Sequence, residues 1–174
     1  MQRNVYITDG YLGLTEYIPS IDDIDCYNCW QDEETQNGYN YNLTESFDEF
    51  KSGSIKSRFI ATIVRCSDNA CIGSIFVSPE NTLPDLAIMI YKCYRNQGYG
   101  TIAFRLGVKY CFNNLLLDKI YAGCYENNEA SKKMLTACGF KSHVEGNQNE
   151  KHYLTGEDII QYDFVIYNHS NERA

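Results

Sequence analysis

Residues 86–101 read Leu-Ala-Ile-Met-Ile-Tyr-Lys-Cys-Tyr-Arg-Asn-Gln-Gly-Tyr-Gly-Thr, and this stretch decides the fold. Its first five residues form an apolar run typical of a buried strand. After the two glycines, Ile102, Leu106 and Tyr110 recur every four residues, which predicts an amphipathic helix from Thr101 to about Asn113. A strand, a glycine-rich turn and a helix in this order can bind a phosphate, because the unpaired amides at a helix N-terminus carry the positive end of its dipole.

The motif in this stretch is Arg95-x-x-Gly98-x-Gly100, and it differs from the usual phosphate loops. No Gly-Lys-Ser/Thr follows, which argues against an NTP-binding P-loop, and a dinucleotide fold needs a longer glycine pattern. Taken alone, the motif is equally compatible with a purely structural turn between a strand and a helix.

The rest of the chain predicts further strands and helices. Toward the C-terminus, the sequence indicates a hairpin of Arg58–Arg65 and Cys71–Ser78 and a strand at Lys119–Tyr125. It then indicates a helix at Ala130–Cys138, which is capped by Asn127 or Asn128 and ended by Gly139. Two strands follow within Lys141–Tyr167 around a polar turn at Glu145–Glu150, and the second of them is Tyr162–Tyr167. Toward the N-terminus, it indicates a strand and turn at Val5–Ile18, a helix at Ile21–Gln31, a loop at Asn37–Asn42 and a short helix through Phe50 capped by Thr44 or Ser46. This order predicts a mixed α+β sheet.

Composition limits the class of protein. The chain has 174 residues, 44% of them hydrophobic, and no repeat or linker divides it, so we expect one domain. It contains no apolar run of the roughly 20 residues that a membrane span needs and no signal peptide, which favours the cytoplasm. The 8 Cys are then reduced thiols in the core. Cys26-x-x-Cys29 lacks a second pair or a nearby His, so no metal site is expected.

The net charge of -8 is unevenly distributed. Residues 4–50 contain 11 acidic side chains and no Lys or Arg, whereas residues 51–174 contain 14 Lys and Arg against 12 Asp and Glu. This asymmetry indicates that the first part meets something cationic and the second tolerates an anion, although a solvated acidic face explains it equally well. An acidic protein also disfavours nucleic acid and anionic membrane as partners.

Several motifs together carry a family resemblance. Leu86–Thr101, the following helix, the strand Lys119–Tyr125, Asn128-x-x-Ser131 and Leu135–Phe140 resemble the GCN5-related N-acetyltransferase (GNAT) family in order and spacing. The resemblance covers about Arg58–Tyr167. It is closest to the branch of ribosomal-protein N-terminal and spermidine acetyltransferases, because that branch shares the Asn-x-x-Ser and Gly-Phe motifs and a helix similar to Tyr27–Glu34.

The resemblance implies a fold and a cofactor. It implies a mostly antiparallel central sheet with helices on both faces and a V-shaped opening between two parallel strands, ending near Tyr91 and Tyr125. Residues 1–57 would form acceptor-side helices and the first strand, residues 58–167 the acetyl-CoA-binding core, and residues 168–174 a loose tail. The residues implied to bind acetyl-CoA are Met89, Ile90, Tyr91, Arg95, Gln97, Gly98, Tyr99, Gly100, Thr101, Asn128 and Ser131.

The chemistry requires a proton acceptor. A primary amine has a pKa near ~10.4, so it arrives protonated and must lose a proton before it attacks a thioester. The resemblance places Asp85 at the start of the strand that leads to the thioester, with Glu33 and Glu34 as further candidates on the acceptor side. Backbone amides near Met89–Tyr91 would stabilise the oxyanion.

The proton donor departs from the family pattern. Many members have a Tyr four residues before the Gly-Phe pair, and this chain has Leu135 there. Ser131, or a water that it holds, then becomes the expected donor, while Tyr125 and Tyr91 stay open as alternatives.

These observations predict an N-acetyltransferase that acts by direct attack on a cationic acceptor: a protein N-terminus, a polyamine or an aminoglycoside. A non-catalytic CoA-binding or sensing module is the alternative, which the absence of a Tyr at position 135 supports, and an interaction domain without CoA is a third hypothesis. An exposed final strand would allow a homodimer.

Overall fold

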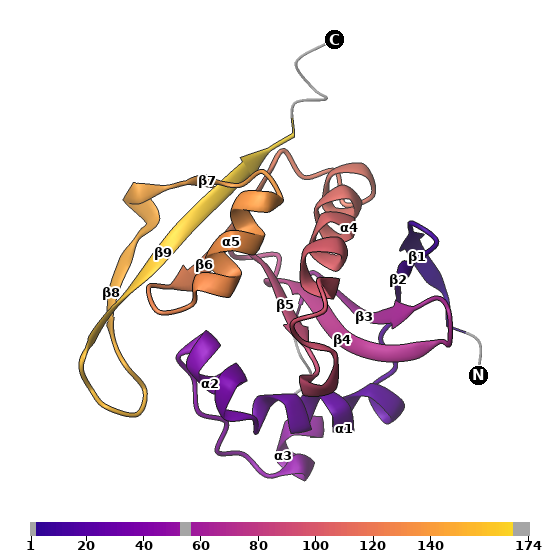
Figure 1. Ribbon diagram of the computed structural model, residues 1–174, viewed down its shortest axis with the longest axis horizontal. Coiled ribbons are helices and arrows are strands. Elements are labelled where there is room, and N and C mark those ends of the chain that lie inside the picture. Colours follow the sequence, from indigo (N-terminus) through magenta and orange to yellow (C-terminus); the bar gives the residue numbers. More distant parts are fainter. Residues whose placement is uncertain (1–2, 53–56, 169–174) are drawn as a thin grey trace.

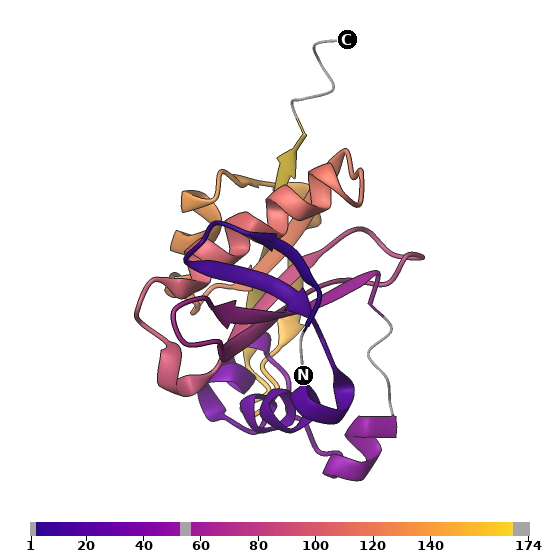
Figure 2. The ribbon, with the colours of Figure 1, turned by 90° about the vertical axis from the view of Figure 1, so that its right-hand side faces the viewer.

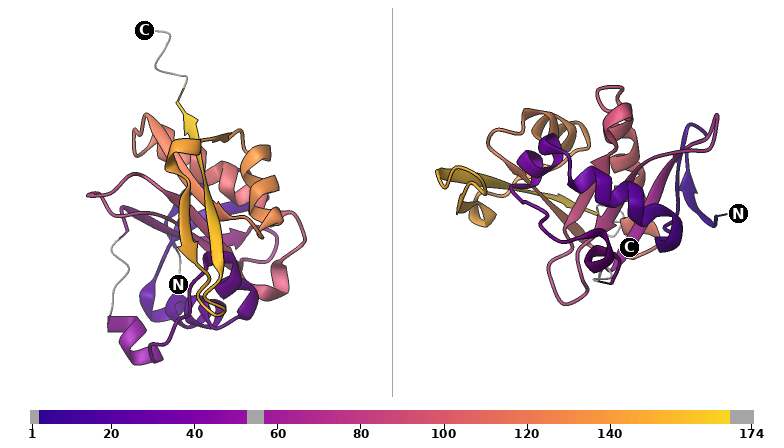
Figure 3. Two further views of the ribbon diagram at one scale, coloured as in Figure 1. Left: turned by 90° about the vertical axis from the view of Figure 1, so that its left-hand side faces the viewer. Right: turned by 90° about the horizontal axis from the view of Figure 1, so that it is seen from below.

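The computed structural model describes residues 3–52 and 57–168, and its strands form two sheets (Figure 1). The first sheet is antiparallel and follows the chain order β1 (Val5–Thr8), β2 (Leu12–Glu16), β3 (Phe59–Arg65), β4 (Ala70–Val77) and β5 (Leu86–Ile90). In the second sheet, β9 (Asp158–Tyr167) pairs on one side with β6 (Lys119–Tyr125) and on the other with β7 (Lys141–Ser142) and β8 (Gln148–Lys151). Figure 3 shows the long hairpin of β8 and β9.

The two sheets meet at the start of β5. Asp85 and Tyr121 form a single parallel bridge, and the Tyr121 amide donates to the carbonyl of Pro84 at 2.9 Å. No further pairing joins β5 and β6 among the described residues, so the two strands diverge beyond this bridge. The predicted splay between two parallel strands is therefore confirmed.

Helices cover both faces of the first sheet, as predicted (Figure 2). On one face α4 (Tyr99–Asn113) packs against β2 and β5 in the main hydrophobic core. On the other face Cys26 and Cys29 of α1 (Pro19–Trp30) are buried against Met89 in a second, smaller core. Strand β5 supplies both cores because successive side chains point to opposite faces: Ile88 and Ile90 face α4, while Met89 faces α1.

The remaining helices lie near the splay. They are α2 (Glu33–Tyr39), α3 (Phe47–Ser52), α5 (Glu129–Ala137) and the short 3₁₀ turns η1 (Lys92–Tyr94) and η2 (Val144–Gly146). Helix α2 contacts β6, and α5 contacts both α4 and β6. Asn128 caps α5 through its side chain, and Gly139 beyond it has a φ of 92°. Ser46 caps α3, since its hydroxyl accepts from the Glu49 amide while the Glu49 carboxylate accepts from Ser46.

Three sequence predictions are wrong. The expected loop at residues 37–42 begins as helix, because α2 extends to Tyr39. The expected turn at Glu145–Glu150 contains η2 and most of β8, and the chain reverses at residues 152–157 instead. The final strand is not exposed along an edge, because β9 has partners on both sides. Of the expected tail, residues 169–174 lie outside the described residues.

Two smaller differences concern the N-terminal part. The stretch Val5–Ile18 holds the two strands β1 and β2 rather than one. Helix α1 begins at Pro19 after Ile18, which has no side-chain cap hydrogen bond, and proline at the first turn suits a helix start. No helix within residues 3–52 and 57–168 is both long and apolar enough to cross a bilayer.

Candidate active site

The loop between β5 and α4 leaves backbone amides open. Asn96 and Gly98 both have left-handed backbone angles, with φ values of 59° and 82°. Gly98 precedes the first helical residue, and no side chain caps α4 there. The first amides of a helix have no partner within the helix, so those of Tyr99, Gly100 and Thr101 point out of its N-terminus together with the positive end of its dipole.

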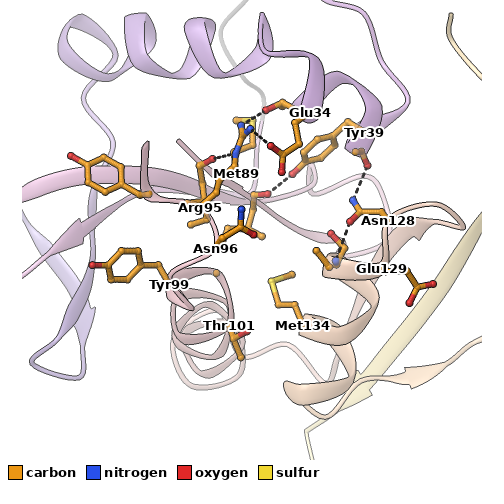
Figure 4. A pocket seen from close by; sticks show the side chains of 18 of the residues that line it. Glu34, Tyr39, Met89, Arg95, Asn96, Tyr99, Thr101, Asn128, Glu129 and Met134 are labelled. Carbon is orange, nitrogen blue, oxygen red and sulfur yellow. Dashed lines mark hydrogen bonds and ion pairs between the residues drawn. The ribbon is translucent and has the colours of Figure 1, made fainter. Parts of the chain in front are cut away.

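These amides face a cavity of about 720 Å³, which we call the first cavity (Figure 4). Four elements enclose it: β5, the N-terminus of α4, the N-terminus of α5, and α2. Of the residues predicted to bind acetyl-CoA, the structure brings together Met89, Ile90, Arg95, Gly98, Tyr99, Gly100, Thr101, Asn128 and Ser131 in the lining, whereas Gln97 and Tyr91 are not part of it.

Arg95 holds α2 against this loop (Figure 4). Its guanidinium donates to the Asp32 carboxylate at 2.5 Å, to that of Glu34 at 3.0 Å and to the Thr35 hydroxyl at 2.7 Å. Its Nε donates to the carbonyl of Ile90 at 2.9 Å. Burial alone would raise the pKa of Asp32, but hydrogen bonds from Arg95 and Lys92 outweigh it and lower the pKa to about 2. The charge expected to serve a phosphate is therefore paired within the protein.

Asn128 and Ser131 lie at the N-terminus of α5 and line the first cavity. The Asn128 side chain accepts from the Ser131 amide at 3.0 Å, which fixes the start of α5. Its amide nitrogen lies 3.5 Å from the carbonyl of Gly38 on α2. Ser131 lines the first cavity and also a second one, so it stands at the junction of the two.

The second cavity measures about 450 Å³ and passes through the splay to the α1 and α2 side. Its wall on that side is aromatic, and its floor comes from both sheets. Its lining includes Trp30, Tyr39, Tyr41, Phe76, Asp85, Ala87, Gly123, Tyr125 and Gln161. It shares Tyr39, Ile88 and Ser131 with the first cavity, so the two spaces adjoin at the middle of β5.

Asp85 is an acidic residue in the lining of the second cavity, and its pKa is shifted toward neutrality. Burial raises the pKa of its carboxyl to about 7, and the negative charge of Asp163 adds to the increase. Asp163 lies 2.6 Å from Nδ1 of His143, on the neighbouring part of the second sheet. A carboxyl with a pKa near neutrality can accept a proton and release it again at physiological pH.

The backbone of β5 directs the amides of Ile88 and Ile90 to the opening. The Tyr91 amide donates to the carbonyl of Ile72 at 2.9 Å, so it is not available as an oxyanion donor, contrary to expectation. In an antiparallel pair these bonds alternate, so Met89, opposite Ser74, also faces β4, while Ile88 and Ile90 face the splay. The carbonyl of Ile88 accepts from the Tyr39 hydroxyl at 2.7 Å, and Ile90 presents its amide.

A family model described as "Acetyltransferase (GNAT) domain" matches residues 13–141. The chain belongs to the GNAT acetyltransferase family. This confirms the resemblance drawn from the sequence. No curated protein matches the chain.

Solved structures show the same fold at low identity. Spermidine N-acetyltransferase from Vibrio cholerae, in complex with CoA and spermine, superposes with a TM-score of 0.80 at 17% identity, covering 91% of this chain and 96% of that one. Ribosomal-protein-S5-alanine acetyltransferase from Vibrio fischeri has a TM-score of 0.72 at 17% identity, covering 94% and 96%. A GNAT acetyltransferase from Bacillus anthracis has a TM-score of 0.73 at 16% identity, covering 90% and 95%.

Two acidic candidates of this GNAT domain lie away from the second cavity. Glu33 is exposed in the first turn of α2 and lines neither cavity. Glu34 lines the first cavity, where it pairs with Arg95. Helix α2 thus turns Glu33 toward solvent and Glu34 toward the loop after β5, and a role of either one at the acceptor stays a prediction.

The aromatic wall of the second cavity is not predicted from the sequence. Trp30 belongs to the stretch Tyr27–Glu34 that carries part of the resemblance, and Tyr39 and Tyr41 lie in the predicted loop at residues 37–42. A cluster of aromatic residues within twelve positions was the available signal. Which of them meet across a cavity depends on how α1 and α2 pack, and a single sequence does not encode that locally.

Proposed function

We propose that this GNAT domain transfers the acetyl group of acetyl-CoA to a primary amine by direct attack. The observation that carries the proposal is the meeting of two cavities at the middle of β5. One holds the uncapped helix N-terminus that suits a phosphate, and the other holds a carboxyl with a pKa of about 7. Two substrates bound in adjoining spaces react at a high effective concentration.

The first cavity fits the donor substrate. The amides of Tyr99, Gly100 and Thr101 would hold the pyrophosphate, and Gly98 lets the backbone approach it closely. Asn128 and Ser131 line the path from α4 toward the middle of β5, which suits the pantetheine arm. In this proposal Arg95 acts by positioning, since it fixes α2 and the loop after β5.

In the second cavity, Asp85 takes a proton from the ammonium group of the acceptor. The freed amine then attacks the thioester carbonyl, and the Ile90 amide donates a hydrogen bond as negative charge develops on that oxygen. The proton that the nitrogen still carries after the attack then passes through the Ser131 hydroxyl, or through a water that it holds, to the departing thiolate, so that Ser131 ends with its hydroxyl intact. Leu135 is buried and lines the second cavity, but leucine has no acidic group that could donate a proton to the thiolate. In this proposal, a hydroxyl on the same helix takes that role.

The acceptor is a primary amine that is protonated in solution. Protein N-termini, polyamines and aminoglycosides are all such compounds, and the first two correspond to the named substrates of the solved neighbours. A CoA-binding module without turnover is the alternative, and the non-titratable Leu135 is the feature that favours it.

Calorimetric titration with acetyl-CoA tests the donor site, using Gly98→Trp and the matched variant Gly10→Trp. Both glycines have positive φ, 82° and 87°, and neither would bring a Cβ within 4 Å of a neighbour. The two substitutions therefore impose similar backbone strain, but Gly10 lies in the turn between β1 and β2, outside both cavities. We expect loss of binding with Gly98→Trp alone. Absence of binding to the unmodified protein would refute the proposal.

Thiol release separates the two functions. An enzyme releases CoA when an amine is added to the acetyl-CoA complex, whereas a sensing module binds acetyl-CoA and releases none.

A further inference from the structure

The acid content of the second cavity is low. Asp85 is the single acidic residue among the described residues that line it. The acids of the N-terminal segment have other partners or face solvent: Asp22 pairs with Arg3, Asp32 with Arg95 and Lys92, Glu34 with Arg95, Asp48 with Lys51, and Asp23 accepts from the Tyr17 hydroxyl. On β8, Glu150 accepts from the hydroxyl of Tyr125 and the amide of Asn40. The described lining itself therefore offers one carboxylate to an ammonium group, that of Asp85, while Glu150 stands behind the Tyr125 hydroxyl.

The wall opposite is built from rings. Trp30 packs on Tyr39 with centroids 4.8 Å apart, and on Tyr41 edge to face at 5.7 Å. Phe76 on β4 and Ala87 on β5 continue the apolar surface toward Asp85. Flat apolar side chains bind flat apolar groups by area burial and by stacking or edge contacts.

Gly123 and Gln161 form part of the floor together. A Cβ built at Gly123 would lie 2.9 Å from Nε2 of Gln161, so the Gln161 side chain occupies the space above this glycine. Ala122 of the same strand is buried in the core and also lines the cavity. A larger side chain at position 123 would displace Gln161 and thereby change the shape of the cavity floor.

From this arrangement we infer that the acceptor is a small primary amine carried on an aromatic body, with no second ammonium group. The inference rests on the proposed acetyl transfer and narrows its acceptor. The ammonium group meets Asp85, and the ring lies against Trp30 and Tyr39. A polyamine would bring further ammonium groups into a space without carboxylates to pair them, and each would lose its hydration uncompensated.

Substrate comparison is the first arm of the test. Thiol release from acetyl-CoA is measured with 2-phenylethylamine, with spermidine and with a short peptide that has a free N-terminus. We expect kcat/KM for 2-phenylethylamine to exceed the other two by about a hundredfold, within the range that a shaped apolar pocket discriminates. Equal or better use of spermidine or of the peptide overturns the inference and leaves the proposed acetyl transfer standing.

Trp30 provides a second arm that does not need turnover. It is the one Trp of the chain, and it lies in the wall of this cavity, so its fluorescence reports occupancy. We expect saturable quenching by 2-phenylethylamine and none by spermidine at the same concentration. Gly123→Val should abolish the quenching and raise KM for the amine at least about tenfold, with acetyl-CoA affinity unchanged.

Ser142→Val is the matched control, because it adds the same β-branched side chain to an exposed strand position of the same sheet, outside the cavity. In Ser142→Val, 2-phenylethylamine should quench the fluorescence of Trp30 as it does in the unmodified protein. If Gly123→Val does not fold, Ala87→Leu narrows the same cavity from β5. Acetyl-CoA binding without quenching or turnover of 2-phenylethylamine overturns the inference, whereas failure to bind acetyl-CoA in calorimetry overturns the proposed function.

Discussion

Asp85 combines two properties that rarely coincide in a carboxyl group. It is fixed by the bridge that joins the two sheets, and its pKa lies near 7 because burial and the charge of Asp163 oppose its ionisation. Nδ1 of His143 lies 2.6 Å from the carboxylate of Asp163. In the proposed function, Asp85 takes a proton from an ammonium group and later releases it.

The pH profile tests this role. The ionised fraction of Asp85 rises up to a pH of about 7, so kcat/KM should rise about tenfold per pH unit below 7 and flatten above it. In Asp85→Asn the rise of kcat/KM with a midpoint near pH 7 should vanish, and the remaining pH dependence should follow the deprotonation of the free amine substrate. The value of kcat should fall by about 10²–10⁴. Glu33→Gln is the control and should leave the profile unchanged. A profile that keeps its limb near 7 in Asp85→Asn would contradict the assignment.

The same group affects stability in the opposite sense to a paired carboxylate. Its pKa is about 7 in the folded protein and about 4 in an unfolded chain. Between these values the folded state holds a proton that the unfolded state has released, so stability falls as the pH rises from about 4 to 7. Asp85→Asn removes this penalty. The melting temperature of Asp85→Asn minus that of the unmodified protein should therefore increase as the pH rises from 4 to 8. Differential scanning calorimetry can measure this difference.

At the scale of elements, α2 is the part that connects the two cavities. It begins at Asp32, whose side chain accepts from the Thr35 amide, and that same carboxylate binds Arg95, 63 residues away in the sequence. Tyr39 at the other end of the helix bonds to β5. Anchored at both ends, α2 forms a wall of each cavity.

Removing the anchor should loosen both sites. The pKa of Asp32 is lowered to about 2 in the folded protein, and it is about 4 in an unfolded chain. The contribution of Asp32 to folding stability is therefore complete above pH 4 and is lost as the pH falls from 4 to 2. At pH 7, Asp32→Asn should cost about 2 kcal/mol in chemical denaturation and weaken acetyl-CoA binding. Asp48→Asn breaks an ion pair in which Asp48 is 89% exposed and should change stability little. Similar losses in the two variants would argue against an anchoring role.

The sequence predicted some elements and not others for physical reasons. β5, β6 and the start of α4 follow from apolar runs and glycine chemistry within a few residues, so they were found within two positions. The C-terminal half of helix α2 is not predicted from the sequence, because Asn37 and Gly38 are poor helix formers. The hydrogen bonds that hold these two residues come from distant parts of the chain. The excess of acids in residues 4–50 is visible in the sequence, but the pairing of Asp22 with Arg3 and of Asp32 with Lys92 and Arg95 depends on distant parts of the chain.

At the scale of the whole molecule, the two adjoining cavities would allow both proposed substrates to be bound at once. None of the residues that line either cavity is a cysteine, so no thiol within the described residues is placed to carry the acetyl group between them. Initial-rate plots should accordingly intersect, as for a ternary complex, and should not be parallel. Mass spectrometry after incubation with acetyl-CoA alone should show no acetylated protein, and a stoichiometric acetyl-protein would contradict direct transfer.

The position of β9 has a consequence for when this protein becomes active. The strand is made after every other strand of either sheet, yet it lies inside the second sheet and brings Gln161 to the acceptor cavity. A chain that ended after α5 would contain all the residues proposed to bind the donor, but β6 would lack its neighbour β9. We therefore expect the proposed acceptor pocket to form only after the C-terminal strand has been made and has paired.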